Sequence, residues 1–143
     1  MSYLKYIFAF LFLGGYAINP AAALSLTAQE SDAETVLMKY FDALSQGDVM
    51  TLRSLMAGEL LAKRAALLSN PTYPSFLAGT YGTARFQIDS VKTVNTSTIE
   101  IDASIIFDQD NNSPRHYLLR DEASGTNLNP IFRIYEDTPQ EGR

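Results

Sequence analysis

Hydrophobic residues recur at helical spacing through residues 31–68 of the sequence. In the first part of this stretch they fall one, three or four positions apart, at Val36, Leu37, Tyr40, Phe41 and Leu44, and so share one face of an amphipathic helix. Ser31 and Glu34 have the spacing of a capping box, which predicts that the helix begins at Ser31. Gly47 predicts its end, because glycine readily adopts the left-handed conformation that closes helices.

A second helical stretch follows directly. Asp48 is a favourable N-cap residue, and the apolar residues of 49–56 keep helical spacing. We expect a bend at Ala57-Gly58, more helix over residues 60–68, and a stop at residues 69–71. The two prolines of residues 71–74 predict an extended turn, since each restricts itself and the residue before it. Residues 75–82 predict one or two further helical turns.

From Ala84 the pattern changes to alternation with a period of two, which predicts β-strands. The first strand covers residues 84–94, with a bulge or register change at Ser90. The clearest strand is residues 98–107, where Ile99, Ile101, Ala103, Ile105 and Phe107 alternate with mostly polar neighbours. Residues 115–122 and 130–136 predict two more strands, and their paired apolar residues leave open which face is buried. Helices followed by an antiparallel meander predict an α+β fold with the helices on one face of a curved sheet.

The first 23 residues differ from the rest of the chain. Lys5 precedes an apolar run over residues 6–17, and small residues end the segment at Ala21-Ala22-Ala23. This layout is typical of a signal peptide and predicts cleavage after Ala23. A membrane anchor is the alternative, but ~12 helical residues span only ~18 Å of a ~30 Å hydrocarbon core. We therefore expect an exported bacterial protein, periplasmic or secreted, without membrane contact after cleavage. Residues 24–30 would be a polar lead, 31–137 one domain and 138–143 a polar tail.

Composition excludes several classes of function. The 143-residue chain has no cysteine, which excludes disulfides, thiolate metal sites and a cysteine nucleophile. Its formal net charge of −5 argues against a nucleic-acid partner. Residues 108–113 begin like a calcium loop, but Ser113 and Leu119 replace its glycine and bidentate glutamate. The sequence therefore predicts no metal and no cofactor. Solvated cross-strand ion pairs explain the strand cations, namely Arg85, Arg115, Arg120 and Arg133.

Three segments carry a family resemblance. They are Y-F-D-A-L-S-Q-G-D at residues 40–48, L-R-S-L-M at 52–56 and I-F-R-I-Y-E at 131–136. In this order they resemble the nuclear transport factor 2-like superfamily, in particular its small exported lumazine-binding-like domains. The resemblance implies a cone-shaped antiparallel curved sheet wrapped around N-terminal helices, a cystatin-like arrangement, with a pocket between them. Residues 132–134 are Phe-Arg-Ile where relatives often carry tryptophan. Members include isomerases, cyclases, carriers and protein-binding modules, so the fold does not fix the activity.

Two residues are candidates for catalysis. Tyr40 matches the helix position at which the ketosteroid isomerase branch places a hydrogen-bond donor, chemistry that also needs a carboxylate base and a second proton donor. The corresponding stretch, residues 69–74, has no acid. His116 is the only histidine, and polyketide-cyclase-like relatives use histidine with aspartate. An isomerase- or cyclase-like enzyme using Tyr40 and His116 is therefore one hypothesis. The alternatives without catalysis are that Tyr40 belongs to the core and that His116 lies on the surface at the start of a strand.

The hypothesis that we favour is non-catalytic binding. A small apolar or aromatic ligand, or a protein partner, would occupy the cone pocket, whose predicted lining is Tyr40, Leu44, Tyr81, Ile101, Phe107 and Tyr117. A third hypothesis is a homodimeric subunit that associates through the outer face of the sheet. It rests on Ile106, the apolar residue on the otherwise polar side of its strand.

Overall fold

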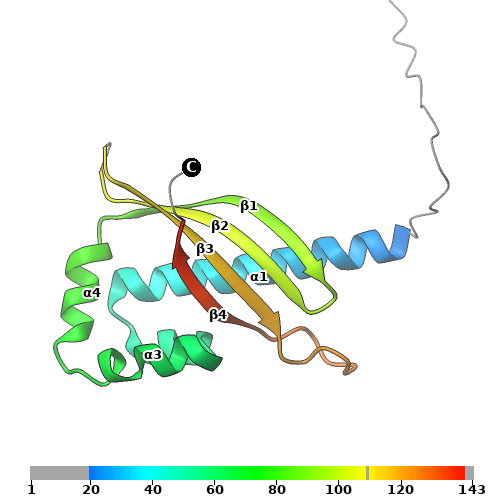
Figure 1. The fold of residues 1–143 in the computed structure, drawn as a ribbon, viewed down its shortest axis with the longest axis horizontal. Helices are drawn as coiled ribbons and strands as arrows, with labels where there is room; N and C mark the ends of the chain where they lie inside the picture. The colour runs from blue at the N-terminus through cyan, green and yellow to red at the C-terminus, as the bar shows by residue number, and fades with distance from the viewer. Residues whose placement is uncertain (1–19, 109, 141–143) are drawn as a thin grey trace, which may run out of the picture.

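The computed structural model describes residues 20–108 and 110–140. Helices α1 (Pro20–Gln46), α2 (Val49–Leu55), α3 (Gly58–Leu68) and α4 (Tyr73–Tyr81) precede strands β1 (Arg85–Asn95), β2 (Thr98–Ile106), β3 (Asn112–Asp121) and β4 (Phe132–Pro139). The strands form one antiparallel sheet in the order β1-β2-β3-β4 (Figure 1). The predicted α+β class is confirmed, as is the curved antiparallel sheet that follows the helices.

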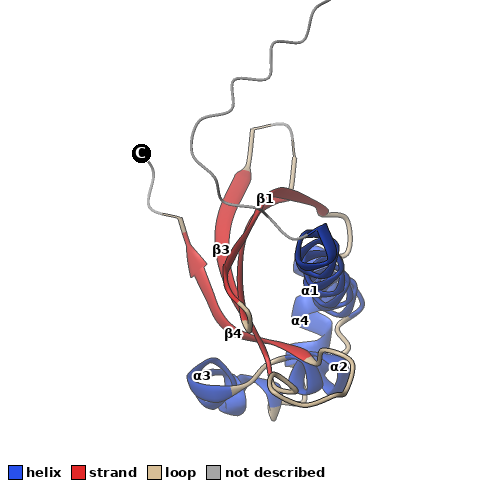
Figure 2. Cartoon of the chain, turned by 90° about the vertical axis from the view of Figure 1, so that its right-hand side faces the viewer, coloured by secondary structure: helices blue, strands red, loops and turns tan. Residues whose placement is uncertain are grey.

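The core lies between α1 and the concave side of the sheet. Figure 2 shows the sheet curving around α1, which is viewed nearly along its axis. The helix buries Leu37, Tyr40 and Phe41 against this side, and Phe41 stacks on Phe86 of β1 with ring centroids 4.5 Å apart. Each fully buried aliphatic or aromatic side chain contributes about 1.5–3 kcal/mol before ordering entropy is counted. This packing fixes α1 in the concavity of the sheet.

The structure also assigns the inner face of the last two strands, which the sequence pattern left open. Tyr117 and Leu119 of β3 pair with Ile101 and Ile99 of β2, and all four are buried. In β4, Ile134 lies opposite Leu119. The pairing of β3 with β4 shifts between Leu118, which lies opposite Glu136, and Leu119, which lies opposite Ile134. The inward-facing residues of β4 therefore have to be assigned separately on the two sides of this shift. The shift predicted at Ser90 of β1 is confirmed.

The junction between α1 and α2 has the predicted form. Gly47 has a φ of 68°, and the Asp48 amide donates to the Ala43 carbonyl over 2.9 Å. The Asp48 carboxylate accepts the Thr51 hydroxyl at 2.6 Å and the Thr51 amide at 3.0 Å, and these bonds lower the pKa of the Asp48 carboxyl. After α2, the Ala57 amide donates to the Ile134 carbonyl of β4 over 3.0 Å, which attaches the predicted bend to the sheet.

Two predicted boundaries at the helix starts are wrong. Helix α1 continues on the N-terminal side of Ser31 to Pro20, and the Ser31 carbonyl accepts a bond from the Thr35 hydroxyl inside the helix. The local capping signal was therefore overridden, and residues 24–30 are helical. Helix α4 begins at Tyr73 with Pro74 in its first turn, where the missing proline amide is not needed. The expected extended turn thus ends before Tyr73.

Strand β4 is longer than the pattern predicted. Its pairing with β3 continues to Arg115 opposite Pro139, so residues 137–139 extend a strand that was expected to end at residue 136. The backbone of β3 supplies the pairing that these polar residues could not indicate by themselves. Most of the predicted signal segment lies outside the described residues, so its cleavage remains a prediction. No helix among the described residues has the length and apolar character needed to cross a bilayer.

Candidate functional site

Asp137 of β4 lies at the centre of a group of polar side chains on the inner side of the sheet. Its Oδ2 accepts the Tyr40 hydroxyl at 2.9 Å and Arg64 Nη2 at 3.2 Å. Its Oδ1 accepts Arg115 Nε at 2.8 Å and also Arg115 Nη2. The Asp137 side chain is 5% exposed. One buried carboxylate therefore joins side chains from α1, α3 and β3.

Strand periodicity explains why these residues converge. Arg115 and Tyr117 are two positions apart on β3 and so point to the same face. Asp137 is the register partner of Tyr117 on β4 and shares that face. We call Tyr40, Arg64, Arg115, Tyr117 and Asp137 the Asp137 cluster.

Burial and the neighbouring charges together shift the pKa values of the Arg64, Arg115 and Tyr40 side chains. Burial would lower the pKa of Arg115, but the Asp137 charge and hydrogen bond outweigh it and raise that pKa. The pKa of Arg64 is raised in the same way, burial being outweighed by Tyr40 and Asp137. Burial, followed by the Asp137 charge, raises the pKa of the Tyr40 hydroxyl well above 10.0. At neutral pH the guanidinium groups of Arg64 and Arg115 therefore stay charged and the Tyr40 hydroxyl keeps its proton.

Tyr117 differs from the other members. Its side chain is fully buried, yet its hydroxyl makes no standard hydrogen bond within the described part of the chain. Its ring packs edge-on against that of Tyr40, with centroids 6.1 Å apart. Burial, followed by the Asp137 charge, raises the pKa of the hydroxyl far above 10.0. A buried hydroxyl without a partner costs free energy, and the group that can relieve this cost at Tyr117 is the Arg115 guanidinium, whose charge and hydrogen bond oppose the rise of the pKa.

Solvent reaches the cluster from one side. A hollow of about 170 Å³ lies between α3 and β4, and its lining is Glu59, Leu60, Lys63, Tyr135, Glu136, Asp137 and Thr138. The Arg64 and Arg115 side chains retain 27% and 19% of their exposure. The cluster is therefore mostly buried, and Asp137 is its member that lines this hollow.

The predicted pocket residues divide into two groups. Leu44 and Ile101 are buried in the hydrophobic core, where they serve packing. Tyr40 and Tyr117 belong to the Asp137 cluster. Tyr81 and Phe107 are partly buried, with ring centroids 5.8 Å apart. Burial raises the pKa of the Tyr81 hydroxyl, and the charges of Arg115 and Asp137 also act on it. The structure thus brings three of the predicted tyrosines to one polar centre.

His116 and Tyr40 do not share a site. His116 lies opposite Asp102 on the outer face of the sheet, and its Nδ1 is 2.8 Å from Asp102 Oδ1. The Ser90 hydroxyl donates to the other oxygen of Asp102 over 3.2 Å. Because the carboxylate separates serine from histidine, His116 cannot activate Ser90 as in a catalytic triad. The sheet lies between His116 and Tyr40. Ile106 is half-buried on the same outer face.

Sequence reasoning missed three members of the site. Arg115 was interpreted as a solvated cation, although its spacing from Tyr117 placed both on one strand face. Asp137 was assigned beyond the end of the last strand. Arg64 belongs to α3 and was not singled out, since nothing local distinguishes it from its neighbour Lys63, whose ion pair with Glu59 is exposed. The alternation of residues 115 and 117 was the one signal that could have indicated the site.

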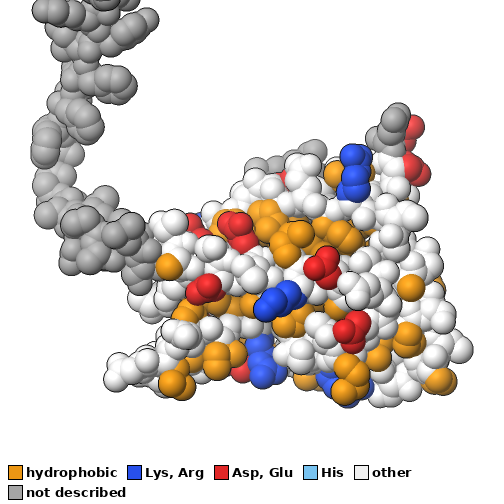
Figure 3. Space-filling model, turned by 180° about the vertical axis from the view of Figure 1, so that it is seen from behind, with side chains coloured by type: hydrophobic (Ala, Val, Ile, Leu, Met, Phe, Trp, Pro, Cys, Tyr) orange, Lys and Arg blue, Asp and Glu red, His pale blue; other side chains and the backbone are white. Residues whose placement is uncertain are grey.

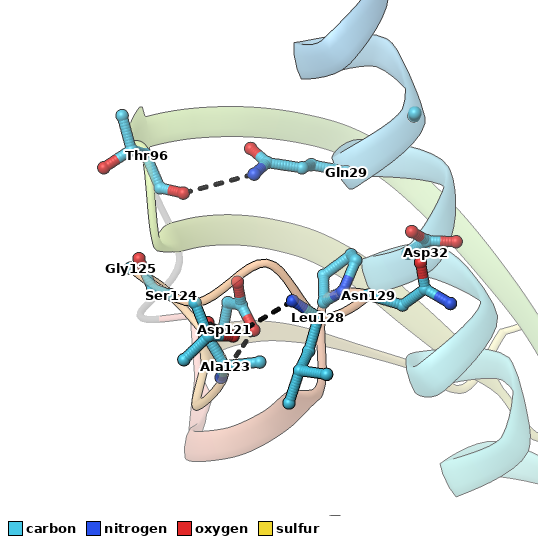
Figure 4. Close-up of a pocket in the computed structure, with 12 residues that line it drawn as sticks. Gln29, Asp32, Thr96, Asp121, Ala123, Ser124, Gly125, Leu128 and Asn129 are labelled. Atoms are coloured by element: carbon cyan, nitrogen blue, oxygen red, sulfur yellow. Dashed lines mark hydrogen bonds between the residues drawn. The ribbon is translucent and has the colours of Figure 1, made fainter.

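Two other hollows have different chemistry. Figure 4 shows one of about 580 Å³ between α1, the β1–β2 turn and the β3–β4 loop. There Gln29 Nε2 donates to the Thr96 carbonyl at 3.3 Å, and Asp121 Oδ1 accepts the amides of Ala123 and Ile131 at 2.9 and 2.8 Å. These bonds hold the loop itself. The other, of about 430 Å³, is lined by Leu67, Asn70, Thr72, Tyr73 and Phe76.

Exposed hydrophobic side chains are spread over the molecule. Figure 3, which shows the side opposite to that of Figure 1, has hydrophobic groups interrupted by charges of both signs. Large exposed examples are Met38, Met50, Leu67, Phe76, Val94, Leu128 and Ile131. In the part of the chain that the structure describes, no three histidine, aspartate or glutamate side chains converge as a metal site.

Comparison of the chain with known proteins found no match to a family model, to a curated protein or to a solved structure. The function is therefore inferred from the chemistry of the site.

Proposed function

We propose that this protein is an exported ligand-binding module with a nuclear transport factor 2-like cone. Support for the cone comes from the curved sheet around α1 and from the helix break at Gly47-Asp48. The ligand is a small molecule with an aromatic or apolar body. It enters the hollow between α3 and β4 and places a polar group at the Asp137 cluster.

One observation supports this proposal: the buried Asp137 cluster, in which the Tyr117 hydroxyl lacks a partner of standard geometry, adjoins a hollow at Asp137. Folded proteins pair nearly all such groups, so a bound molecule is a natural partner. The volume of about 170 Å³ suits a small ring, since engineered cavities of about 150 Å³ accept benzene. Catalysis by Tyr40 has less support, because its hydroxyl proton is held by Asp137.

Native mass spectrometry tests the proposal. The protein recovered from its own exported compartment should carry a reproducible extra mass that denaturation removes. Protein that has been denatured, dialysed and refolded is the matched control. It should lack this mass and regain it from the small-molecule fraction of the same compartment. An unliganded mass in both samples would contradict ligand binding and favour a protein partner, and the same spectra would report a homodimer.

A further inference from the structure

We infer a second binding site, in the hollow between the end of α3 and the start of α4, which takes the neutral pyranose ring of a sugar. It is separate from the hollow at Asp137 and does not depend on the proposed function. The site has a volume of about 430 Å³ and is lined by Leu67, Asn70, Thr72, Tyr73 and Phe76. Small-molecule sites commonly have volumes of ~300–1,000 Å³, so a sugar ring fits by size.

The first argument is an exposed aromatic ring. Tyr73 and Phe76 are three positions apart on α4 and so lie on one face of the helix, with ring centroids 5.9 Å apart and ring planes 14° from parallel. Tyr73 is 9% exposed, whereas Phe76 is 60% exposed and Leu67, at the end of α3, is 45% exposed. Exposure of such apolar surface to water is unfavourable. A pyranose ring has a face of C–H groups, and this face can cover an aromatic ring.

The second argument concerns the polar groups of the turn between the two helices. Asn70 Oδ1 accepts both the Thr72 amide and the Thr72 hydroxyl, each at 2.9 Å. Because an amide N–H can only donate, these bonds identify Oδ1 and leave Asn70 Nδ2 as a donor, with no bond to another described residue. The Thr72 hydroxyl uses its proton in the turn and keeps the capacity to accept. A sugar hydroxyl both donates and accepts, so it suits this pair.

The third argument is that the site is preformed and uncharged. The Tyr73 amide donates to the Asn70 carbonyl over 3.1 Å, and the Phe76 amide donates to the Thr72 carbonyl over 3.2 Å. These bonds fix the turn and the start of α4, which lowers the ordering cost of binding. None of the five lining side chains carries a formal charge. A neutral sugar is therefore favoured over an acidic or an amino sugar, and the amide and hydroxyl favour it over a purely apolar molecule.

Saturation-transfer-difference NMR of the protein tests the inference. The probes are four neutral disaccharides, namely cellobiose, maltose, lactose and N,N′-diacetylchitobiose, and sorbitol is the matched control because it has hydroxyls but no ring face. At least one disaccharide should bind with a Kd of about 10 mM or less, with saturation strongest at the C–H groups of one ring. Sorbitol should bind about tenfold more weakly or worse. Failure of all four disaccharides, or equal binding of sorbitol, would overturn the inference.

Variants of the lining residues locate the site. Phe76→Ala should weaken sugar binding about tenfold or more, whereas Phe76→Tyr, which keeps a ring, should stay within about threefold of the wild type. Asn70→Asp keeps the oxygen that accepts Thr72 but replaces the Nδ2 donor, and should weaken binding about threefold or more. Met50→Ala is the control, because Met50 is 74% exposed on α2 and does not line the hollow, and it should leave the affinity unchanged.

Two results from the variants would overturn the inference. One is unchanged sugar affinity in Phe76→Ala, which would place any bound sugar elsewhere on the protein. The other is a wild-type homodimer, measured by light scattering, that Phe76→Ala converts to a monomer, because the hollow would then be a contact between two copies of the chain. Phe76 is mostly exposed, so its replacement should leave the fold intact.

Discussion

At the scale of single residues, Asp137 joins several elements through side-chain hydrogen bonds. It is the common acceptor for Tyr40, Arg64 and Arg115, which belong to three different elements. Its removal would leave two mostly buried cations without a counter-charge, and an uncompensated buried charge costs more than a lost surface pair.

Asp137→Asn should therefore lower the free energy of unfolding by about 2–4 kcal/mol, measured by urea denaturation. Asp102→Asn is the matched control, because it breaks the pair with His116 on the outer face, where the side chains are 39% and 31% exposed. This control should cost less than about 1 kcal/mol. Equal losses for both variants would show that the buried position of Asp137 has no special energetic weight.

The two buried tyrosines predict a dependence on alkaline pH. The pKa values of Tyr40 and Tyr117 are raised in the folded protein relative to the ordinary value of 10.0, so folding favours the protonated forms. Their contribution to stability is complete below about pH 10 and is lost as the pH rises towards the folded pKa values. The denaturation midpoint should therefore fall above about pH 10. In a spectrophotometric titration both tyrosines should ionise together with unfolding, whereas Tyr135, on the surface, should ionise earlier. Ionisation of all tyrosines in the folded state would contradict this.

At the scale of elements, the junction between α1 and α2 was predicted correctly, whereas the starts of α1 and α4 were not. Gly47 was predictable because its left-handed conformation is a property of the residue itself. Ser31 was not, since its capping signal is local and the helix continued through it. Pro74 was misassigned because proline suits both a turn and the first turn of a helix. At Ser31 and at Pro74 the sequence was thus compatible with two local structures.

Glycine substitutions test the contact between α1 and α4. A Cβ atom on Gly47 would lie 2.2 Å from the Pro74 carbonyl oxygen, and its φ is 68°. Gly47→Ala should therefore destabilise the protein by about 2 kcal/mol or more. Gly79 of α4 has no neighbouring atom within 4 Å of such a Cβ, so Gly79→Ala should stabilise by about 0.5–1 kcal/mol. Chemical denaturation of both variants measures the two effects. A destabilised Gly79→Ala variant would show that α4 cannot accept a methyl group at this position.

At the scale of the whole molecule, the curved sheet separates two polar systems. The Asp137 cluster lies on the inner side, and the pair of Asp102 and His116 lies on the outer side. His116→Gln should therefore leave any extra mass in the native mass spectrum unchanged and cost less than about 1 kcal/mol of stability. Native mass spectrometry and a denaturation curve check both expectations. Loss of the extra mass in this variant would indicate coupling through the sheet.

The α+β class was predictable from the sequence, and the site only partly so. Hydrophobic periods of 3.6 and 2 report local structure, which is why the order of helices and strands was predicted. The site depends on which distant residues meet: Tyr40 and Asp137 are 97 positions apart. Nothing in the local pattern of either residue indicates the other. The tyrosines were predicted because they also fit the apolar pattern, whereas the arginines and the aspartate resembled ordinary surface residues.

The late position of Asp137 along the chain has a consequence for the order of folding. Helices α1 to α4 and strands β1 to β3 are all synthesised before the carboxylate that joins Tyr40, Arg64 and Arg115. Contacts of such long sequence separation also form slowly. In the nascent chain, Arg64 and Arg115 therefore cannot form their ion pairs with Asp137 until β4 has been made.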